Sequence, residues 1–220
     1  MSHLESDIKA VREGILLMWD LVLSQLQKSL SSLLNFDKDL AREVVFMEKR
    51  VNATEIQIDW DCENVFALFS PVAIDLRFLL AILKINSNLE RTGDIAEAVA
   101  KFVINADQPF AQDLLDKTQV IEMFDAGIRM LEETKGAFQA ENTALARGIF
   151  AKDETLDKIN RSANENVIDY LKVHPEDIDQ ALYALSIIRK LERIGDQAKN
   201  IAEEIIFYVE AKVIKHSHKK

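Results

Sequence analysis

This chain of 220 residues has one cysteine, three prolines and six glycines. The single cysteine, Cys62, excludes an intrachain disulfide framework and favours a reducing compartment. Apolar runs are also short: the run at 78–83 ends at Lys84, so no stretch is long enough to span a membrane. Residues 1–7 lack a basic segment followed by an apolar one, so we expect no signal peptide. These absences together predict a cytoplasmic protein without membrane insertion.

Positive charge is scarce relative to negative charge. The chain has 27 Lys and Arg against 37 Asp and Glu, which gives a formal net charge of −10. An acidic protein gains no electrostatic help in meeting nucleic acid or anionic lipid, so we expect neither as a general partner. The sequence also has no Gly-rich phosphate loop and no Ser/His/Asp order of a hydrolase. We therefore expect a protein that is not an enzyme and has no catalytic residues.

Few prolines and glycines leave long stretches with helical periodicity. In the first stretch, Ile8, Val11, Ile15 and later apolar residues recur at steps of three and four. Ser70 with Pro71, and Pro175, are typical helix starts. The sequence predicts six helices, at 4–34, 37–68, 71–105, 112–139, 142–173 and 175–214. The expected fold is all-α, with two tandem, pseudo-symmetric three-helix bundles at 1–107 and 108–214 and a basic tail at 215–220. The third helix, apolar over much of its circumference, should be central.

Two further features are open to more than one interpretation. Trp19 and Trp60 are expected to be partly buried packing residues, with contact to a partner as the alternative. The basic tail, which carries His216 and His218, is expected to fray, with binding of a metal or a partner as the alternative. Long apolar helix faces make a homodimer reasonable.

One segment of the chain is repeated almost unchanged. Leu89–Ala96 returns as Leu191–Ala198, an offset of 102 residues (192 − 90), and the copy keeps two carboxylates, an arginine and a glycine. Residues four apart share a helix face, so Glu90 with Asp94 forms a stacked pair of like charges that repel. Glycine inside a helix costs about 1 kcal/mol relative to alanine. Its repetition at Gly93 and Gly195 indicates close helix approach or a need for backbone access.

A second acidic pattern is repeated in the preceding helices. Glu48 and Asn52 correspond to Asp153 and Asp157, at an offset of 105 residues (157 − 52). In antiparallel bundles Glu48 and Asn52 could face the Glu90–Asp94 pair, and Asp153 and Asp157 could face the Glu192–Asp196 pair. The converging oxygens would suit Mg²⁺, Ca²⁺, Mn²⁺, iron or Zn²⁺. The candidate metal ligands are Glu48, Asn52, Glu90, Asp94, Asp153, Asp157, Glu192 and Asp196. Because Asn52 is neutral, the first site should hold a cation less strongly than the second.

The alternative is a pair of solvated acidic faces without metal. Arg91 and Arg193 could then neutralise the carboxylates through salt bridges, and the chain would be a metal-free helical interaction or dimerisation module. A di-iron enzyme of the ferritin type is a further alternative, but such sites use Glu-x-x-His, and no histidine here has a glutamate three residues before it.

These motifs together resemble the PhoU family of bacterial phosphate-signalling accessory proteins. The resemblance is carried by Pro71–Arg77, Leu83–Lys84, Leu89–Asp94, Leu191–Asp196 and Ala198–Glu203, and it covers essentially the whole chain. It implies paired three-helix bundles, and metal contact by the six acidic residues at 90, 94, 153, 157, 192 and 196, with Glu48 and Asn52 less surely. The chain departs from the pattern at Asn52, at Ala98, which corresponds to Asn200, and at 177–179.

The resemblance also implies a cytoplasmic role. A member of this family would couple the ATPase of a high-affinity phosphate transporter to a sensor histidine kinase, and would restrain the phosphate-starvation response when phosphate is plentiful. An accessory subunit of a low-affinity phosphate permease is the alternative that the sequence separates least well.

Overall fold

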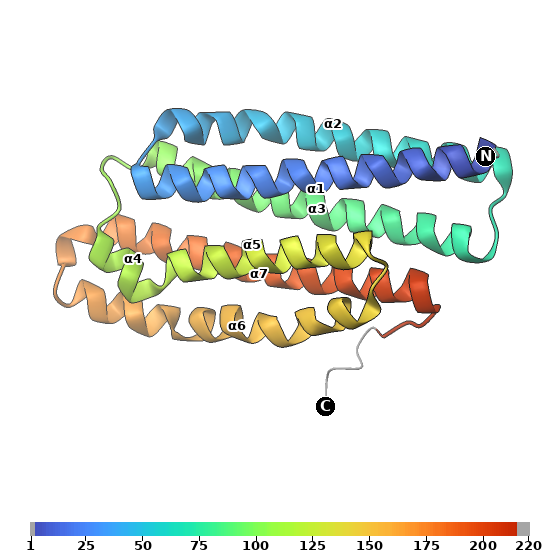
Figure 1. Cartoon of the computed structure of the whole chain (residues 1–220). Helices are drawn as coiled ribbons and strands as arrows, with labels where there is room; N and C mark the ends of the chain where they lie inside the picture. Colours follow the sequence, from blue (N-terminus) through green and yellow to red (C-terminus); the bar gives the residue numbers. More distant parts are fainter. Residues whose placement is uncertain (1–2, 215–220) are drawn as a thin grey trace.

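The computed structural model describes residues 3–214 and is all-α, with no strand in that range. The first half contains α1 (His3–Asn35), α2 (Lys38–Phe69) and α3 (Ala73–Asn105). The second half contains α4 (Gln112–Thr118), α5 (Val120–Gln139), α6 (Thr143–Leu171), the 3₁₀ turn η1 (Pro175–Asp177) and α7 (Ile178–Glu210). The predicted fold class is therefore confirmed (Figure 1). The basic tail 215–220, with His216 and His218, lies outside the described residues.

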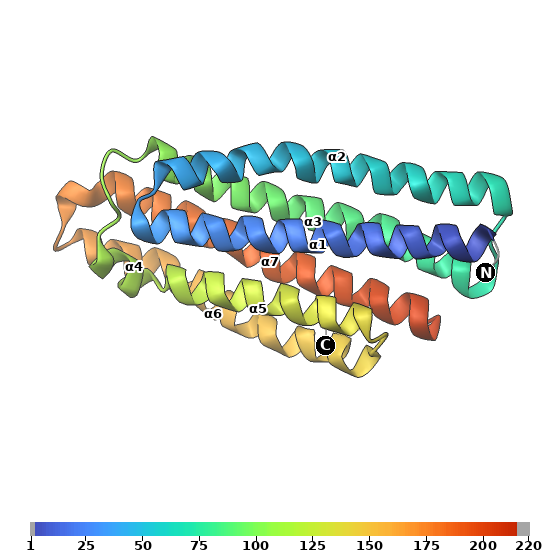
Figure 2. The same cartoon turned by 45° about the horizontal axis from the view of Figure 1, so that its top comes forward.

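The halves are two elongated bundles that lie side by side. Within each half each long helix runs antiparallel to the next one along the chain (Figures 1 and 2). Across the boundary α3 contacts α7, and α1 packs against α5. The central position predicted for the third helix is confirmed, since α3 contacts α1, α2 and α7. None of the helices within residues 3–214 has the length and apolar character needed to cross a bilayer.

Several predicted helix boundaries are wrong, and the last helix, expected to reach residue 214, ends at Glu210. Ser70 ends α2 in the left-handed region, with φ 47°, and α3 begins only at Ala73 without a side-chain cap. A left-handed residue closes one helix and cannot also adopt the extended conformation of an N-cap, so Ser70 cannot start α3. The helix expected at 112–139 is interrupted at Gln119, which has φ 58°. This break turns α4 so that it packs on α6 and α7 as well as α5.

A buried aromatic group joins the two halves. Trp19 of α1 is 0% exposed, and its Nε1 donates a hydrogen bond to the Leu131 carbonyl of α5 at 3.2 Å. Its ring lies 5.5 Å from that of Phe138, which contacts Tyr208 at 6.0 Å. The halves therefore share one apolar core. Trp60 differs, because it is 60% exposed on α2. The expectation of burial is correct for Trp19 and wrong for Trp60.

Candidate metal centre

The first acidic cluster lies between α2 and α3. It consists of Glu48 from α2 with Glu90 and Asp94 from α3, and one carboxylate oxygen of each residue lies within 4.8 Å of the other two. Glu48 is 5% exposed, Glu90 is half-buried and Asp94 is exposed. The cluster is thus buried on its α2 side and open to solvent on the other side. A small cation could reach three carboxylates there from two helices.

Glu48 is held in place by a neighbouring amide and by the absence of a side chain on α3. Its Oε2 accepts a hydrogen bond from Gln25 Nε2 at 2.7 Å, while its buried Oε1 has no hydrogen-bond partner among the described residues. A Cβ at Gly93 would lie 3.1 Å from Glu48 Oε2 and 3.0 Å from Gln25 Oε1. The close approach predicted from this glycine is confirmed. It brings Glu48 against the backbone of α3.

This environment disfavours negative charge on Glu48. Burial raises the pKa of its carboxyl to about 7, and the charges of Asp94, Glu97 and Glu90 act in the same direction, while the Gln25 hydrogen bond opposes them. Burial together with the charge of Asp94 also raises the pKa of Glu90. A carboxyl that resists ionisation, with one oxygen unpartnered, is the setting that a bound cation would relieve.

Further charges surround the first cluster. Burial and the charges of Asp59 and Asp94 raise the pKa of Glu55, which extends the acidic group along α2. Arg91 is exposed and forms no ion pair within residues 3–214. Its positive charge only partly offsets the rise in the pKa values of Glu55 and Glu90. The salt bridge from Arg91 that the metal-free alternative invoked is therefore not present among the described residues. Carboxylates dominate this end of the α2–α3 interface.

The second acidic cluster lies between α6 and α7 and is closed by a lysine. Asp153 of α6 is 5% exposed, and its Oδ2 pairs with Lys199 Nζ, which also lies 2.9 Å from Asp196 Oδ1. Burial raises the pKa of Glu192, and the charges of Asp196, Asp157 and Asp153 act in the same direction. Lys199, rather than the exposed Arg193, forms the ion pairs with Asp153 and Asp196.

Gly195 repeats the packing seen at Gly93. A Cβ at this position would overlap Asp153 Oδ1, so the aspartate can lie against α7 only because the residue is glycine. Burial raises the pKa of Asp153, and the hydrogen bond from Lys199 counteracts that effect. Burial disfavours the charge of Lys199, but its hydrogen bonds to Asp153 and Asp196 raise the pKa of the ammonium above its usual value. The second cluster thus contains its own cation on Asp153 Oδ2, while Asp153 Oδ1, like Glu48 Oε1, is buried without a hydrogen-bond partner among the described residues.

Of the eight predicted ligand positions, the structure brings Glu48, Glu90 and Asp94 to within 4.8 Å of one another, and Lys199 links Asp153 to Asp196. Asn52 is exposed, and its side chain hydrogen-bonds to none of the described residues. Sequence reasoning missed Gln25, Glu97 and Lys199. The last two could have been found by extending the repeat, because each follows the motif aspartate by three residues and occupies the same face of the helix.

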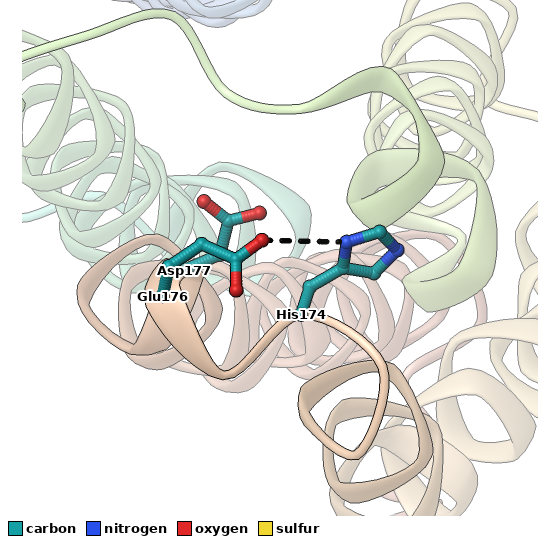
Figure 3. A group of neighbouring side chains, drawn as sticks. All are labelled: His174, Glu176 and Asp177. Carbon is teal, nitrogen blue, oxygen red and sulfur yellow. Dashed lines mark ion pairs between the residues drawn. The ribbon is translucent and has the colours of Figure 1, made fainter.

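A third group of potential ligands lies at the turn between α6 and α7 (Figure 3). His174 Nδ1 lies 3.7 Å from Glu176 Oε1. One potential ligand atom from each of His174, Glu176 and Asp177 lies within 4.8 Å of the other two. Asp177 Oδ2 accepts a 2.6 Å hydrogen bond from the Tyr170 hydroxyl, whose ring stacks on His174 at 4.6 Å. From the sequence, this segment is predicted only as a helix start. These local partners account for the geometry of the group.

The comparisons with known proteins agree with both halves of this architecture. The model of the PhoU domain matches residues 15–103 and 120–205, once in each half of the chain. The chain belongs to the PhoU family. The exact boundary at 107/108 stays a prediction.

Relatives in the PhoU family span nearly the whole chain. A PhoU homolog from Burkholderia sp, described as a phosphate-specific transport system accessory protein, is 33% identical over 98% of this chain and 92% of its own length. The accessory protein PhoU from Escherichia coli K12 is 29% identical over 96% of this chain and 87% of its own length.

Solved PhoU structures have the same fold. The crystal structure of PhoU from Pseudomonas aeruginosa has a TM-score of 0.85, with 30% identity, 94% of this chain covered and 99% of that chain. The structure of a phosphate transport system regulatory protein PhoU from Streptococcus pneumoniae has a TM-score of 0.86, with 26% identity and coverages of 97% and 100%. The tandem bundle is therefore the architecture of this family.

Proposed function

We propose that this chain is a non-enzymatic accessory and regulatory protein of phosphate uptake. The observation that carries the proposal is the match of the family to both halves, together with relatives named as accessory proteins of phosphate transport. In the finer form of the proposal, the chain acts in the cytoplasm as an adaptor between the ATPase of a high-affinity transporter and a sensor histidine kinase. It would restrain the starvation response when phosphate is plentiful.

The surface of α2 supports a role in protein recognition. Phe46, Ile56, Trp60 and Leu68 are large apolar residues of α2 that are more than half exposed. Their positions fall on one side of the helix at 100° per residue. Large apolar side chains on one exposed side of a helix are typical of an interaction surface. Partner contact, the alternative weighed for Trp60, becomes the preferred interpretation of its exposure.

The first acidic cluster supports metal binding as part of this function. The oxygen-only donor set of Glu48, Glu90 and Asp94 fits a hard divalent or trivalent cation, and the unpartnered Oε1 of Glu48 is a buried group that such a cation would satisfy. When bound, the cation would supply positive charge that neutralises the repelling carboxylates. The chain's own contribution is to hold Glu48 with Gln25 and to keep α3 close at Gly93.

Copurification tests the proposal directly. The tagged chain is recovered from cells with and without Mn²⁺ or a chelator, and the eluate is probed for the transporter ATPase and the sensor kinase. Glu48→Gln alters the cluster, and Glu63→Gln, on an exposed part of α2, removes the same charge as a matched control. We expect partner recovery by the native chain and the Glu63 variant, with weaker, metal-independent recovery by the Glu48 variant.

The adaptor role fails if neither partner is recovered and a deletion strain keeps normal phosphate-starvation control. Recovery of a single-component permease in their place would assign the chain to that permease. Recovery of only a second copy of the chain, as a dimer of defined mass, would assign the α2 surface to self-association. If the native chain and the Glu48 and Glu63 variants all recover the partners equally with and without metal, the adaptor role stands and metal has no part in it.

A further inference from the structure

The two acidic clusters carry opposite charges at one equivalent position beside the repeated motif. Glu97 follows Asp94 by three residues, and Lys199 follows Asp196 by three residues, so the offset of 102 that relates the motifs also relates these two (199 − 97). Residues three apart on a helix are neighbours on its surface. The repeat therefore places a negative side chain beside one cluster and a positive side chain beside the other.

Lys199 occupies the position where a bridging cation would act. Its ammonium contacts Asp153 on α6 and Asp196 on α7, so a single positive group links the same two helices that a metal would link. Lys199 is half-buried and Asp153 is buried, so this pair is shielded from solvent more than an ordinary surface ion pair. A metal entering the second cluster would have to displace the ammonium or bind beside it, against charge repulsion.

The first cluster has the opposite arrangement. No cation of the described residues forms an ion pair with Glu48, Glu90 or Asp94. Glu97 adds a negative charge near Glu48, and its own ion pair is with Lys101, at 2.6 Å along the helix. Replacing a lysine by a glutamate at the repeat position thus leaves the carboxylates of the first cluster without an internal counter-ion.

We propose that Lys199 is the resident cation of the second cluster, so that metal binding is confined to the first cluster. The inference rests on the proposed metal-binding function of that first cluster. It reverses the order of affinity expected from the neutral Asn52, because the ammonium of Lys199 outweighs the extra carboxylate of Asp157. The two halves of the chain then perform different tasks. The first half responds to metal, and the second half is held together without it.

Metal stoichiometry of the whole chain tests this inference. Purified protein is dialysed to equilibrium against Mn²⁺, and bound metal is measured by elemental analysis and by the loss of the free-ion electron paramagnetic resonance signal. The variants are Lys199→Met, which removes the ammonium, and Lys199→Gln, which keeps a hydrogen-bond donor without charge. Lys190→Met, on the same helix, is the control for net charge. Circular dichroism confirms that each variant is folded.

The expected result is that native protein loses its bound Mn²⁺ on Glu48→Gln and keeps it on Asp153→Asn. Both Lys199 variants gain a second class of binding site, which Asp153→Asn abolishes, and the Lys190 control gains none. Loss of metal from the native chain on Asp153→Asn would overturn the inference. So would a folded Lys199 variant that binds no additional metal.

This experiment separates the inference from the function on which it rests. If the native chain binds no Mn²⁺, the proposed metal role of the first cluster is refuted, but the Lys199 variants still decide the second cluster. A gain of metal that depends on Asp153 supports the assignment of Lys199, and no gain overturns it.

The reciprocal exchange gives an independent test at the first cluster. Glu97→Lys places an ammonium at the position equivalent to Lys199, and we expect the Kd for Mn²⁺ to rise by about tenfold or more, since a unit charge at contact distance opposes a second cation. Glu97→Gln is the control, because it removes a carboxylate without adding a cation. Equal affinities of the Lys and Gln variants would contradict the inference.

Discussion

Replacement of Glu48 by glutamine should stabilise the metal-free protein at alkaline pH. Burial raises the pKa of the Glu48 carboxyl from 4.5 to about 7. Between these values the folded chain holds a proton that the unfolded chain has lost, so this group lowers the free energy of unfolding as pH rises. Below pH 4.5 the carboxyl is protonated in both the folded and the unfolded chain, so it has no effect on stability. Above about pH 7 it is ionised in both, and the free energy of unfolding is lowered by the full amount.

The magnitude follows from the width of that interval. At 1.36 kcal/mol for each pH unit it corresponds to about 3 kcal/mol. Solvent reaches the neighbouring Asp94 and screens the charge, which reduces the expected effect to about 1–2 kcal/mol. A glutamine at position 48 carries no charge, and its amide could donate to the buried, unpartnered Oε1 of Gln25. We therefore expect a gain of about 1–2 kcal/mol at pH 8 and almost none at pH 4.5.

Urea denaturation in the presence of a chelator, at several pH values from 4.5 to 8, measures this difference. Glu63→Gln is the control for an exposed carboxyl on the same helix. With saturating Mn²⁺ the sign should reverse, because ligand at 100 times its Kd adds about 2.7 kcal/mol to a protein that binds it. A Glu48 variant that is less stable than native protein at pH 8 without metal, or equally changed at all pH values, would refute the reasoning.

Three further predictions concern packing and partner contact. Gly195→Ala should lower the free energy of unfolding, because the new Cβ would overlap Asp153. Gly148→Ala, which has open space around it, should raise that energy by up to about 1 kcal/mol. Equal effects of the two variants in urea denaturation would contradict this prediction. Trp19→Ala should lower the free energy of unfolding by about 3–5 kcal/mol, because it removes a large, fully buried side chain from the core. Trp60→Ala should change stability by no more than about 0.5 kcal/mol yet reduce copurification of a partner, and unchanged recovery would remove Trp60 from the interaction surface.

The long helices could be predicted from sequence because their apolar residues recur over many turns. The ends were less predictable, since they depend on single residues. Ser70 is a good N-cap by type, but the chain uses it in a left-handed conformation to end α2. Gln119 likewise interrupts a continuous helical pattern so that α4 can pack on α6 and α7. Periodicity contains no information on where a helix must bend to meet a neighbour.

The glycines were the most reliable guide to the site. A glycine inside a helix is unfavourable on its own, so its repetition at Gly93 and Gly195 predicted close packing without naming the group that approaches. In the structure the Gln25 amide and the Glu48 carboxylate approach Gly93, and the Asp153 carboxylate approaches Gly195. The identity depends on the distance between helices, which the spacing of residues along one helix cannot supply.

A repeated motif predicts repeated chemistry only if the residues around it repeat as well. The motif carboxylates at 90 and 94 match those at 192 and 196, but the charge on the same helix face is reversed between Glu97 and Lys199. A residue outside the motif therefore decides whether the carboxylates pair with a free metal ion or with the ammonium of a lysine on the same helix. If an ancestral duplication produced two equal sites, this substitution is sufficient to separate them, because an ammonium fixed to α7 is present at an effective concentration that no free metal ion matches.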